Sequence, residues 1–165
     1  MTAPLDAIHG LAARQVALLN GELNLRPAAS HPALHACARG DVPGPVLCYI
    51  LVEDGNTVTA LVNFRPREAI DGLPAFNIEL SVPEDRRRQG RGQDAVDAAL
   101  LEVRHELARS GISSFHVEAI VEMDNAASLR IAENSISEIR TATTDRYTGR
   151  PAFRYLRSFE PAPPG

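Results

Sequence analysis

Apolar residues change their spacing part-way along the chain, and this change divides the sequence into two regions. In residues 5–23 apolar side chains recur every three or four positions, which predicts an amphipathic helix. Residues 24–45 are rich in proline, alanine and glycine, and a serine N-cap favours a short second helix over 30–38. After this region the apolar spacing becomes typical of strands. We therefore expect N-terminal helices in 1–44 and a sheet-containing core in 45–159.

The core region alternates strands with two helices. Strands are expected at 46–53, 57–66, 75–82, 112–123, 138–147 and 152–159, and helices at 93–109 and 124–134. The order β-β-β-α-β-α-β-β predicts an α/β or α+β fold with a mixed sheet, in one domain over 1–165. The proline-rich end, 160–165, is expected to fray.

Composition narrows the function classes. All 17 basic residues are arginine, so a Walker-type phosphate loop and a Schiff-base lysine are both excluded. The formal net charge of −4 argues against a general nucleic-acid partner. No apolar run is long enough for a membrane span, and the first residues lack a signal-peptide pattern. Because Cys37 and Cys48 match no metal spacing, we expect a cytoplasmic protein with reduced thiols and no metal.

A charged loop that contains two glycines joins the strand at 75–82 to the helix at 93–109. Gly90 and Gly92 let the backbone approach a ligand closely, and the start of the helix adds N–H donors and a partial positive charge. Four arginines reinforce that charge: Arg86, Arg87, Arg88 and Arg91. These features are typical of a pyrophosphate-binding turn, although a solvated basic loop before a helix would share them.

Two segments carry a more specific resemblance. The run Arg87-Arg88-Gln89-Gly90-Arg91-Gly92 resembles the R/Q-x-x-G-x-G/A acetyl-CoA signature of the GCN5-related N-acetyltransferase (GNAT) superfamily. Further on, Asn125 opens a helix after a strand, which resembles the family's second ligand segment. The pattern from Asn125 through Ser128 to Glu133 is most similar to the branch that acetylates the N-termini of ribosomal proteins.

The resemblance implies a GNAT-type fold whose central, mostly antiparallel sheet is flanked by helices and splays apart between the edges 78–82 and 116–121. It implies acetyl-CoA as co-substrate, with its pantetheine arm pairing like an extra strand. The cofactor residues that it implies are Leu80, Ser81 and Val82 for pantetheine, then Arg87, Arg88, Gln89, Gly90, Arg91, Gly92 and Gln93 for the pyrophosphate, and Asn125 with Ser128 nearby. Asn125 could equally be a plain helix N-cap.

The implied reaction is direct attack of a primary amine, on a small molecule or a protein N-terminus, on the acetyl thioester in a ternary complex. The amine must lose a proton, so a general base is expected. Candidate bases are Glu79 first, then Glu118, Glu122 and His116, although each carboxylate could instead pair with an arginine. Tyr155 or Tyr147 could protonate the thiolate or line the acceptor side, or simply pack in the core.

The acceptor itself is not encoded in a motif. Arg65, Arg67, Arg150 and Arg154 are candidates for shaping its pocket, and their number hints at an acceptor that carries a carboxylate or phosphate beside its amine. The Gly-Phe pair usual in the branch is missing, and Ala132 stands where many members have a tyrosine. A second interpretation is therefore a GNAT-like module that binds acyl-CoA, turns over weakly and has a regulatory or scaffold role. Either form is expected as a monomer or homodimer.

Overall fold

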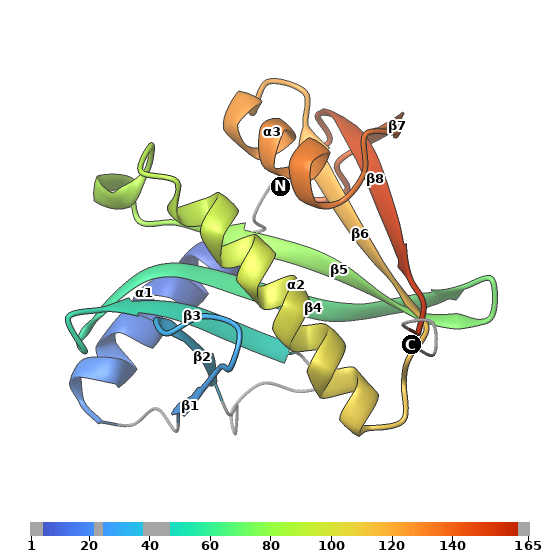
Figure 1. The fold of residues 1–165 in the computed structure, drawn as a ribbon. Coiled ribbons are helices and arrows are strands. Elements are labelled where there is room, and N and C mark those ends of the chain that lie inside the picture. The colour runs from blue at the N-terminus through green and yellow to red at the C-terminus, as the bar shows by residue number, and fades with distance from the viewer. Residues whose placement is uncertain (1–4, 22–24, 38–46, 162–165) are drawn as a thin grey trace.

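The computed structural model describes residues 5–21, 25–37 and 47–161. Its elements are α1 (Leu5–Leu19), β1 (Leu25–Pro27), β2 (Leu34–Cys37), β3 (Leu47–Glu53), β4 (Thr57–Ile70), β5 (Leu73–Ser81), the 3₁₀ turn η1 (Glu84–Arg86), α2 (Arg91–Arg109), β6 (Phe115–Glu122), α3 (Ala126–Ser135), β7 (Arg140–Thr144) and β8 (Pro151–Phe159). The strands form one sheet in the order β1-β2-β3-β4-β5-β6-β8-β7. This arrangement confirms the predicted mixed α/β fold (Figure 1).

The pairing of β5 with β6 divides the sheet into two parts. It is the only parallel pair that the described strands form, and it joins just Ala75–Asn77 to His116–Glu118. Past Asn77, β5 stays paired with β4 and β6 stays paired with β8, so the two strands separate (Figure 1). We call the three-residue contact the vertex. The predicted splay is present, but on the β6 side it begins at Ala119 rather than at residue 116.

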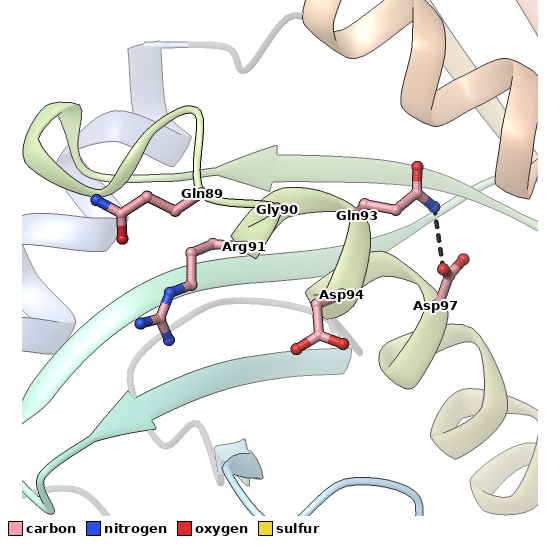
Figure 2. Close-up of a pocket in the computed structure, with 6 residues that line it drawn as sticks. All are labelled: Gln89, Gly90, Arg91, Gln93, Asp94 and Asp97. Atoms are coloured by element: carbon pink, nitrogen blue, oxygen red, sulfur yellow. Dashed lines mark hydrogen bonds between the residues drawn. The ribbon is translucent and has the colours of Figure 1, made fainter.

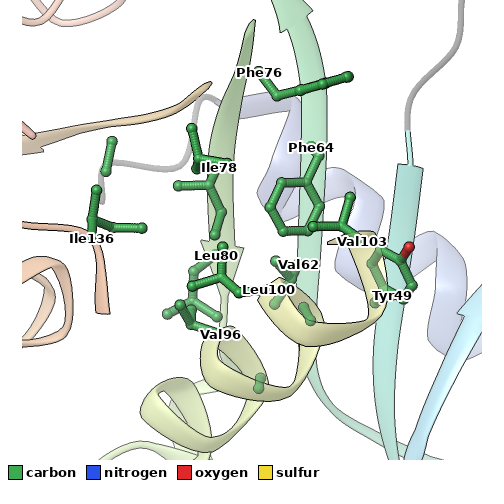
Figure 3. Packing of buried hydrophobic residues seen from close by; sticks show 14 of the residues in the cluster. Tyr49, Val62, Phe64, Phe76, Ile78, Leu80, Val96, Leu100, Val103 and Ile136 are labelled. Atoms are coloured by element: carbon green, nitrogen blue, oxygen red, sulfur yellow. The ribbon is translucent and has the colours of Figure 1, made fainter. Parts of the chain in front are cut away.

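Helix α2 fixes the position of the loop that precedes it. Its apolar side chains, among them Val96, Leu100 and Val103, pack on Val62 and Leu80 of the sheet in one buried cluster (Figure 3). The opposite face of the sheet has a smaller buried cluster around Ile50 and Leu61, against which Leu18 of α1 packs. The two helices thus cover opposite faces of the sheet, and Gly92 of α2 lies against Leu80 and Val82, which places the start of α2 beside the end of β5.

The short helix expected over 30–38 is wrong. Leu34–Cys37 is a strand that pairs with β3, and β1 in turn pairs with it. The serine expected to cap a helix is instead bound to α2, because Ser30 Oγ donates to the carbonyl of Ala98 and Glu102 Oε1 accepts the Ser30 N–H. Contacts with a distant helix therefore override the local propensity of this segment.

Other boundaries differ by a few residues. The strand β4 runs to Ile70 because Asp71 and Gly72, both at positive φ, form a tight turn into β5. The strand β7 is shorter than the predicted 138–147, since the Asp145 carboxylate accepts N–H groups of the following turn. The ends of the first predicted helix, beyond Gly21, and of the predicted frayed tail, beyond Pro161, lie outside the described residues. None of the described helices is long and apolar enough to cross a membrane.

Candidate functional site

The loop between β5 and α2 makes two left-handed bends. Arg88 has φ 64° and Gly90 has φ 74°, and α2 begins at Arg91 immediately after them. Gly90 occupies the N-cap position and supplies no side-chain acceptor, so the first N–H groups of α2 lack a side-chain cap. Uncapped N–H groups and the positive end of the helix dipole together favour an anion at this point.

The two glycines of the loop serve different needs. Gly90 is required for its backbone, because a left-handed φ strains residues that carry a Cβ. Gly92 is required for space, since a Cβ there would lie 3.0 Å from both Ile131 Cδ1 and Leu80 Cδ2. Gly92 therefore lets the start of α2 pack closely against β5 and α3.

Three of the four loop arginines have partners. Arg86 and Arg91 both pair with the Glu53 carboxylate, at 2.9 and 3.1 Å, and Arg87 Nε donates to the carbonyl of Val82 at 3.2 Å. Arg88 is exposed and has no hydrogen-bond or ion-pair partner within the described ranges. Sequence reasoning missed Glu53, because only the pairing of β3 and β4 brings this strand end beside the loop.

An open hollow of about 520 Å³ lies at the start of α2 (Figure 2). Its lining residues are Gln89, Gly90, Arg91, Gln93, Asp94 and Asp97, four of which are predicted pyrophosphate residues. The side chain of Gln93 turns away from the loop and bonds Asp97 and Ser135, which ties α2 to α3. Only the backbone of Gln93 is then left for an anion. The carboxylate of Asp94 pairs with His31 at 2.9 Å.

The segment predicted to be the second ligand segment lies at the start of α3. Asn125 is its N-cap, and the Asn125 Oδ1 accepts the backbone N–H of Ser128 at 3.2 Å. The structure therefore shows the plain capping role that the sequence left open. Leu80, Ser81 and Val82 follow the vertex on the β5 side, and the Leu80 side chain packs into the core beneath α2.

A row of polar side chains lies on the sheet face opposite α2. Strand register places these residues on that one face: Asn63, Arg65 and Arg67 of β4, Asn77, Glu79 and Ser81 of β5, His116, Glu118 and Glu122 of β6, and Arg154 and Ser158 of β8. All three glutamates, Asn63, Ser81 and His116 are buried. We call this set the polar face. Two of the predicted bases, Glu79 and Glu118, and the alternative, His116, thus lie at or beside the vertex, whereas Glu122 shares the face but lies at the far end of β6.

Glu79 and Glu118 differ in how many arginines they bond. Glu79 Oε1 accepts from Arg65 Nε at 2.7 Å, whereas its buried Oε2 has no hydrogen-bond partner among the described residues. Glu118 Oε2 accepts from Arg67 Nη1 at 2.6 Å and from Arg154 Nε at 2.5 Å. Each of these carboxylates is therefore held through one oxygen, Glu79 by one arginine and Glu118 by two.

The remaining candidates are held in other ways. His116 Nδ1 bonds Ser158 Oγ at 2.8 Å, and Glu122 pairs with Arg150 at 3.2 Å. Tyr155 is fully buried in the main core, on the face opposite Glu79, so the structure favours its packing role. Tyr147 lies in the exposed turn after β7.

Among the described residues no group of three or more His, Cys, Asp or Glu side chains is placed to hold a metal ion.

Comparisons with known proteins give a fold but no close relative. A scan against protein-family models finds no match, and neither does a search of the curated proteins. Among solved structures, RimL, a ribosomal L7/L12 alpha-N-protein acetyltransferase, in complex with coenzyme A is 19% identical, with a TM-score of 0.50 over 71% of this chain and 64% of that one. An apo form of RimL is 16% identical, with a TM-score of 0.53 over 82% of this chain and 94% of that one.

A third similar structure is the ribosomal-protein-S5-alanine acetyltransferase from Vibrio fischeri. It is 10% identical, with a TM-score of 0.54 over 68% of this chain and 61% of that one. The aligned region thus spans less than two thirds of the coenzyme A-bound RimL chain and of the Vibrio fischeri chain. These similarities agree with the helix-flanked sheet that splays at a vertex between β5 and β6. The chain therefore has the fold of the GNAT acetyltransferases.

Proposed function

We propose that this chain is an acetyl-CoA-dependent N-acetyltransferase, an acyltransferase that transfers an acetyl group to a primary amine in a ternary complex. One observation carries the proposal: β5 and β6 separate at the vertex, and the uncapped start of α2 lies at the end of β5. An opened sheet edge can pair with an extended pantetheine arm, and a helix N-terminus can bind a pyrophosphate. The fold shared with acetyltransferases, one of them in complex with coenzyme A, supports the same function.

The contacts proposed for acetyl-CoA follow the two walls of the splay. Backbone groups of Leu80, Ser81 and Val82 pair with pantetheine along β5, and Asn125 and Ser128 lie beside it at the start of α3. The backbone N–H groups from Arg87 through Gln93 hold the pyrophosphate. The exposed Arg88 guanidinium, with no protein partner among the described residues, adds a charged donor for a phosphate oxygen.

In the proposed reaction, the neutral amine nitrogen bonds to the acetyl carbon, the carbon–sulfur bond breaks, and coenzyme A leaves as a thiolate. The proton lost by the nitrogen passes to Glu79, whose Oε2 is unoccupied while Arg65 holds Oε1 in place. Glu118 is a weaker candidate because two guanidiniums already bond one of its oxygens. Holding both reactants together supplies most of the acceleration, and a general base adds about 10²–10⁴-fold.

One observation favours a second candidate function, a GNAT-like acyl-CoA-binding module with weak turnover. Ala132 has no proton to give, and Tyr155 is fully buried with its hydroxyl 3.5 Å from Glu133 Oε1, so this alternative assigns neither residue as the proton donor to the leaving thiolate. In this case coenzyme A binds but amines do not stimulate its release from acetyl-CoA.

Thiol release from acetyl-CoA, measured across a panel of primary amines, tests the enzyme against the module. The enzyme predicts release that depends on the amine and saturates with it. Binding of coenzyme A with no amine-dependent release would instead support the module. Neither binding nor release, in folded protein, would overturn both.

A further inference from the structure

The polar face contains an excess of positive charge at the vertex, and this excess bears on the acceptor of the proposed reaction. Arg67 and Arg154 both bond the same oxygen of Glu118, at 2.6 and 2.5 Å. One carboxylate offsets one guanidinium, so this triad carries a net charge of +1. The neighbouring pair of Arg65 with Glu79 is neutral. Arg150, with Glu122 and Asp124, lies at the other end of β6, at about 13 Å by strand rise.

The two guanidiniums of the triad retain unused donors. Arg154 bonds Glu118 through Nε alone, so its Nη1 and Nη2 have no partner within the described part of the chain. The side chains of Arg67 and Arg154 are 27% and 35% exposed, whereas Glu118 is 6% exposed. The carboxylate is thus covered while the guanidiniums can still be reached. Two adjacent guanidiniums with free N–H groups are suited to a carboxylate or a phosphate.

Beside this triad lies a set of buried oxygens that lack donors. Glu79 Oε2, Asn63 Oδ1, Asn77 Oδ1 and Ser81 Oγ are all buried without a hydrogen-bond partner among the described residues. Asn63 is the register partner of Glu79, and Asn77 and Ser81 flank Glu79 on the same face of β5. Three of the four are carboxylate or amide oxygens, which can only accept, and the Ser81 hydroxyl supplies a single donor, so the set lacks a group with several N–H donors. An ammonium or amine nitrogen is such a group.

The two features are close enough for one small molecule to reach both. Asn77 is paired with Glu118 across the vertex, and Glu79 is two residues from Asn77. Neighbouring strands are about 5 Å apart and alternate residues about 7 Å apart, so the Cα atoms of Glu79 and Glu118 are about 8 Å apart, or slightly more because the strands diverge past Asn77. The side chains that carry the two features thus start from neighbouring positions on one face of the sheet.

We propose, on the basis of the proposed function, that the acceptor is a small primary amine that carries a carboxylate or phosphate a few bonds from its nitrogen. The nitrogen is received by Glu79, Asn63 and Asn77, and the anionic group by Arg67 and Arg154. Binding in this way places the amine beside the proposed base. The anionic group of the acceptor also offsets the net charge of +1 on the triad.

Matched amines test the proposal by comparing kcat/KM for thiol release. The panel pairs β-alanine with propylamine, and 2-aminoethyl phosphate with ethanolamine. Two charge-assisted contacts predict that the anionic member of a pair is preferred by about 10- to 100-fold in the wild-type protein. Arg154→Gln and Arg67→Gln should each reduce that preference, mainly by raising KM for the anionic amine. Arg109→Gln, an exposed arginine at the far end of α2, is the matched control and should retain the preference.

Calorimetric titration of β-alanine, with and without bound coenzyme A, gives a readout that does not need turnover. We expect β-alanine to bind the wild-type protein and bind more weakly to Arg154→Gln, while both proteins bind coenzyme A equally. Equal rates for the members of each pair, an unchanged preference in both arginine variants, or acetylation only of a peptide with an acidic N-terminal residue would overturn the proposal. Failure of the proposed function is distinct, because it would abolish coenzyme A binding and all amine-stimulated release.

Discussion

At the scale of single residues, Glu79 differs from the other carboxylates near the vertex. Its Oε1 is fixed by Arg65 and its Oε2 is buried without a partner in the described ranges, whereas Glu118 is engaged by two arginines through one oxygen. A base must have an oxygen available to take a proton and must be held in position. Both glutamates meet these conditions, and Glu79 is placed ahead of Glu118 because one guanidinium, rather than two, stabilises its charged form against taking up a proton.

Replacement of Glu79 by glutamine should lower kcat/KM for amine acetylation by about 10²–10⁴-fold, because the amide cannot accept the proton. Glutamine retains an oxygen for the contact with Arg65, so coenzyme A affinity and thermal stability should change little. Steady-state thiol release measures the effect, with Glu68→Gln, at an exposed position of β4, as the matched control. Full activity of Glu79→Gln would assign the proton to another group.

Gly90 allows a second test at the residue scale. A Cβ at Gly90 would meet no atom within 4 Å, so the cost of substitution comes from the left-handed backbone alone. Gly90→Ala should lower the free energy of unfolding by about 1–2 kcal/mol. Gly90→Asn should cost less, because asparagine tolerates this conformation better. Denaturant unfolding of both variants measures the difference, and equal losses would mean that φ is not the cause.

At the scale of elements, the contact between the loop before β2 and α2 explains a strand where sequence favoured a helix. The buried Glu102 Oε1 accepts the N–H groups of Ala29 and Ser30, at 3.0 and 3.2 Å. These bonds hold residues 29 and 30 in a non-helical conformation and direct the following residues along β3. The same helix face that builds the core thus also determines the edge of the sheet.

Glu102→Ala should reduce the free energy of unfolding by about 2–4 kcal/mol, because two N–H groups lose a charged acceptor in a partly buried site. Glu102→Gln keeps an acceptor oxygen and should lose clearly less. Urea unfolding followed by circular dichroism gives both values. Equal stability of Glu102→Ala and the wild-type protein would show that the loop is held by other contacts.

The sequence predicts the structure well where the signal is local, and poorly where it depends on distant residues. The helix predicted at 93–109 and found at Arg91–Arg109, and the glycine-containing turn before it, were predictable because apolar spacing, Gly90 and Gly92 lie within one short segment. The segment 30–38 was not, since its conformation depends on Glu102, far along the chain. Within the sheet, too, contacts between residues far apart in the chain were not predictable.

For the site, the sequence predicted the charged members of the polar face but not which arginine bonds which glutamate. Glu79, Glu118 and their arginines stand out as charges on expected strands. Asn63 and Asn77 did not stand out, because a single amide within a strand carries no signal of its own. Their meaning comes from the β4–β5 register, which places Asn63 directly opposite Glu79.

At the scale of the whole molecule, two half-sheets are joined by a three-residue vertex and by the contacts of α2 with α3. Gln93, Asp97 and Ser135 form one such contact across the two helices. A ligand in the splay would contact both halves and so bind only the folded chain. Ligand at 100 times its dissociation constant should then stabilise the fold by about 2.7 kcal/mol.

The most direct test of the central claim is a calorimetric titration of coenzyme A into the folded protein, with pantetheine titrated in parallel. We expect saturable binding of one coenzyme A per chain and a rise in Tm. We also expect a much weaker response to pantetheine, which lacks the pyrophosphate proposed to bind at the start of α2. Absence of heat and of any shift in Tm with coenzyme A, in protein shown to be folded by circular dichroism, would mean that the splay and the start of α2 do not bind coenzyme A.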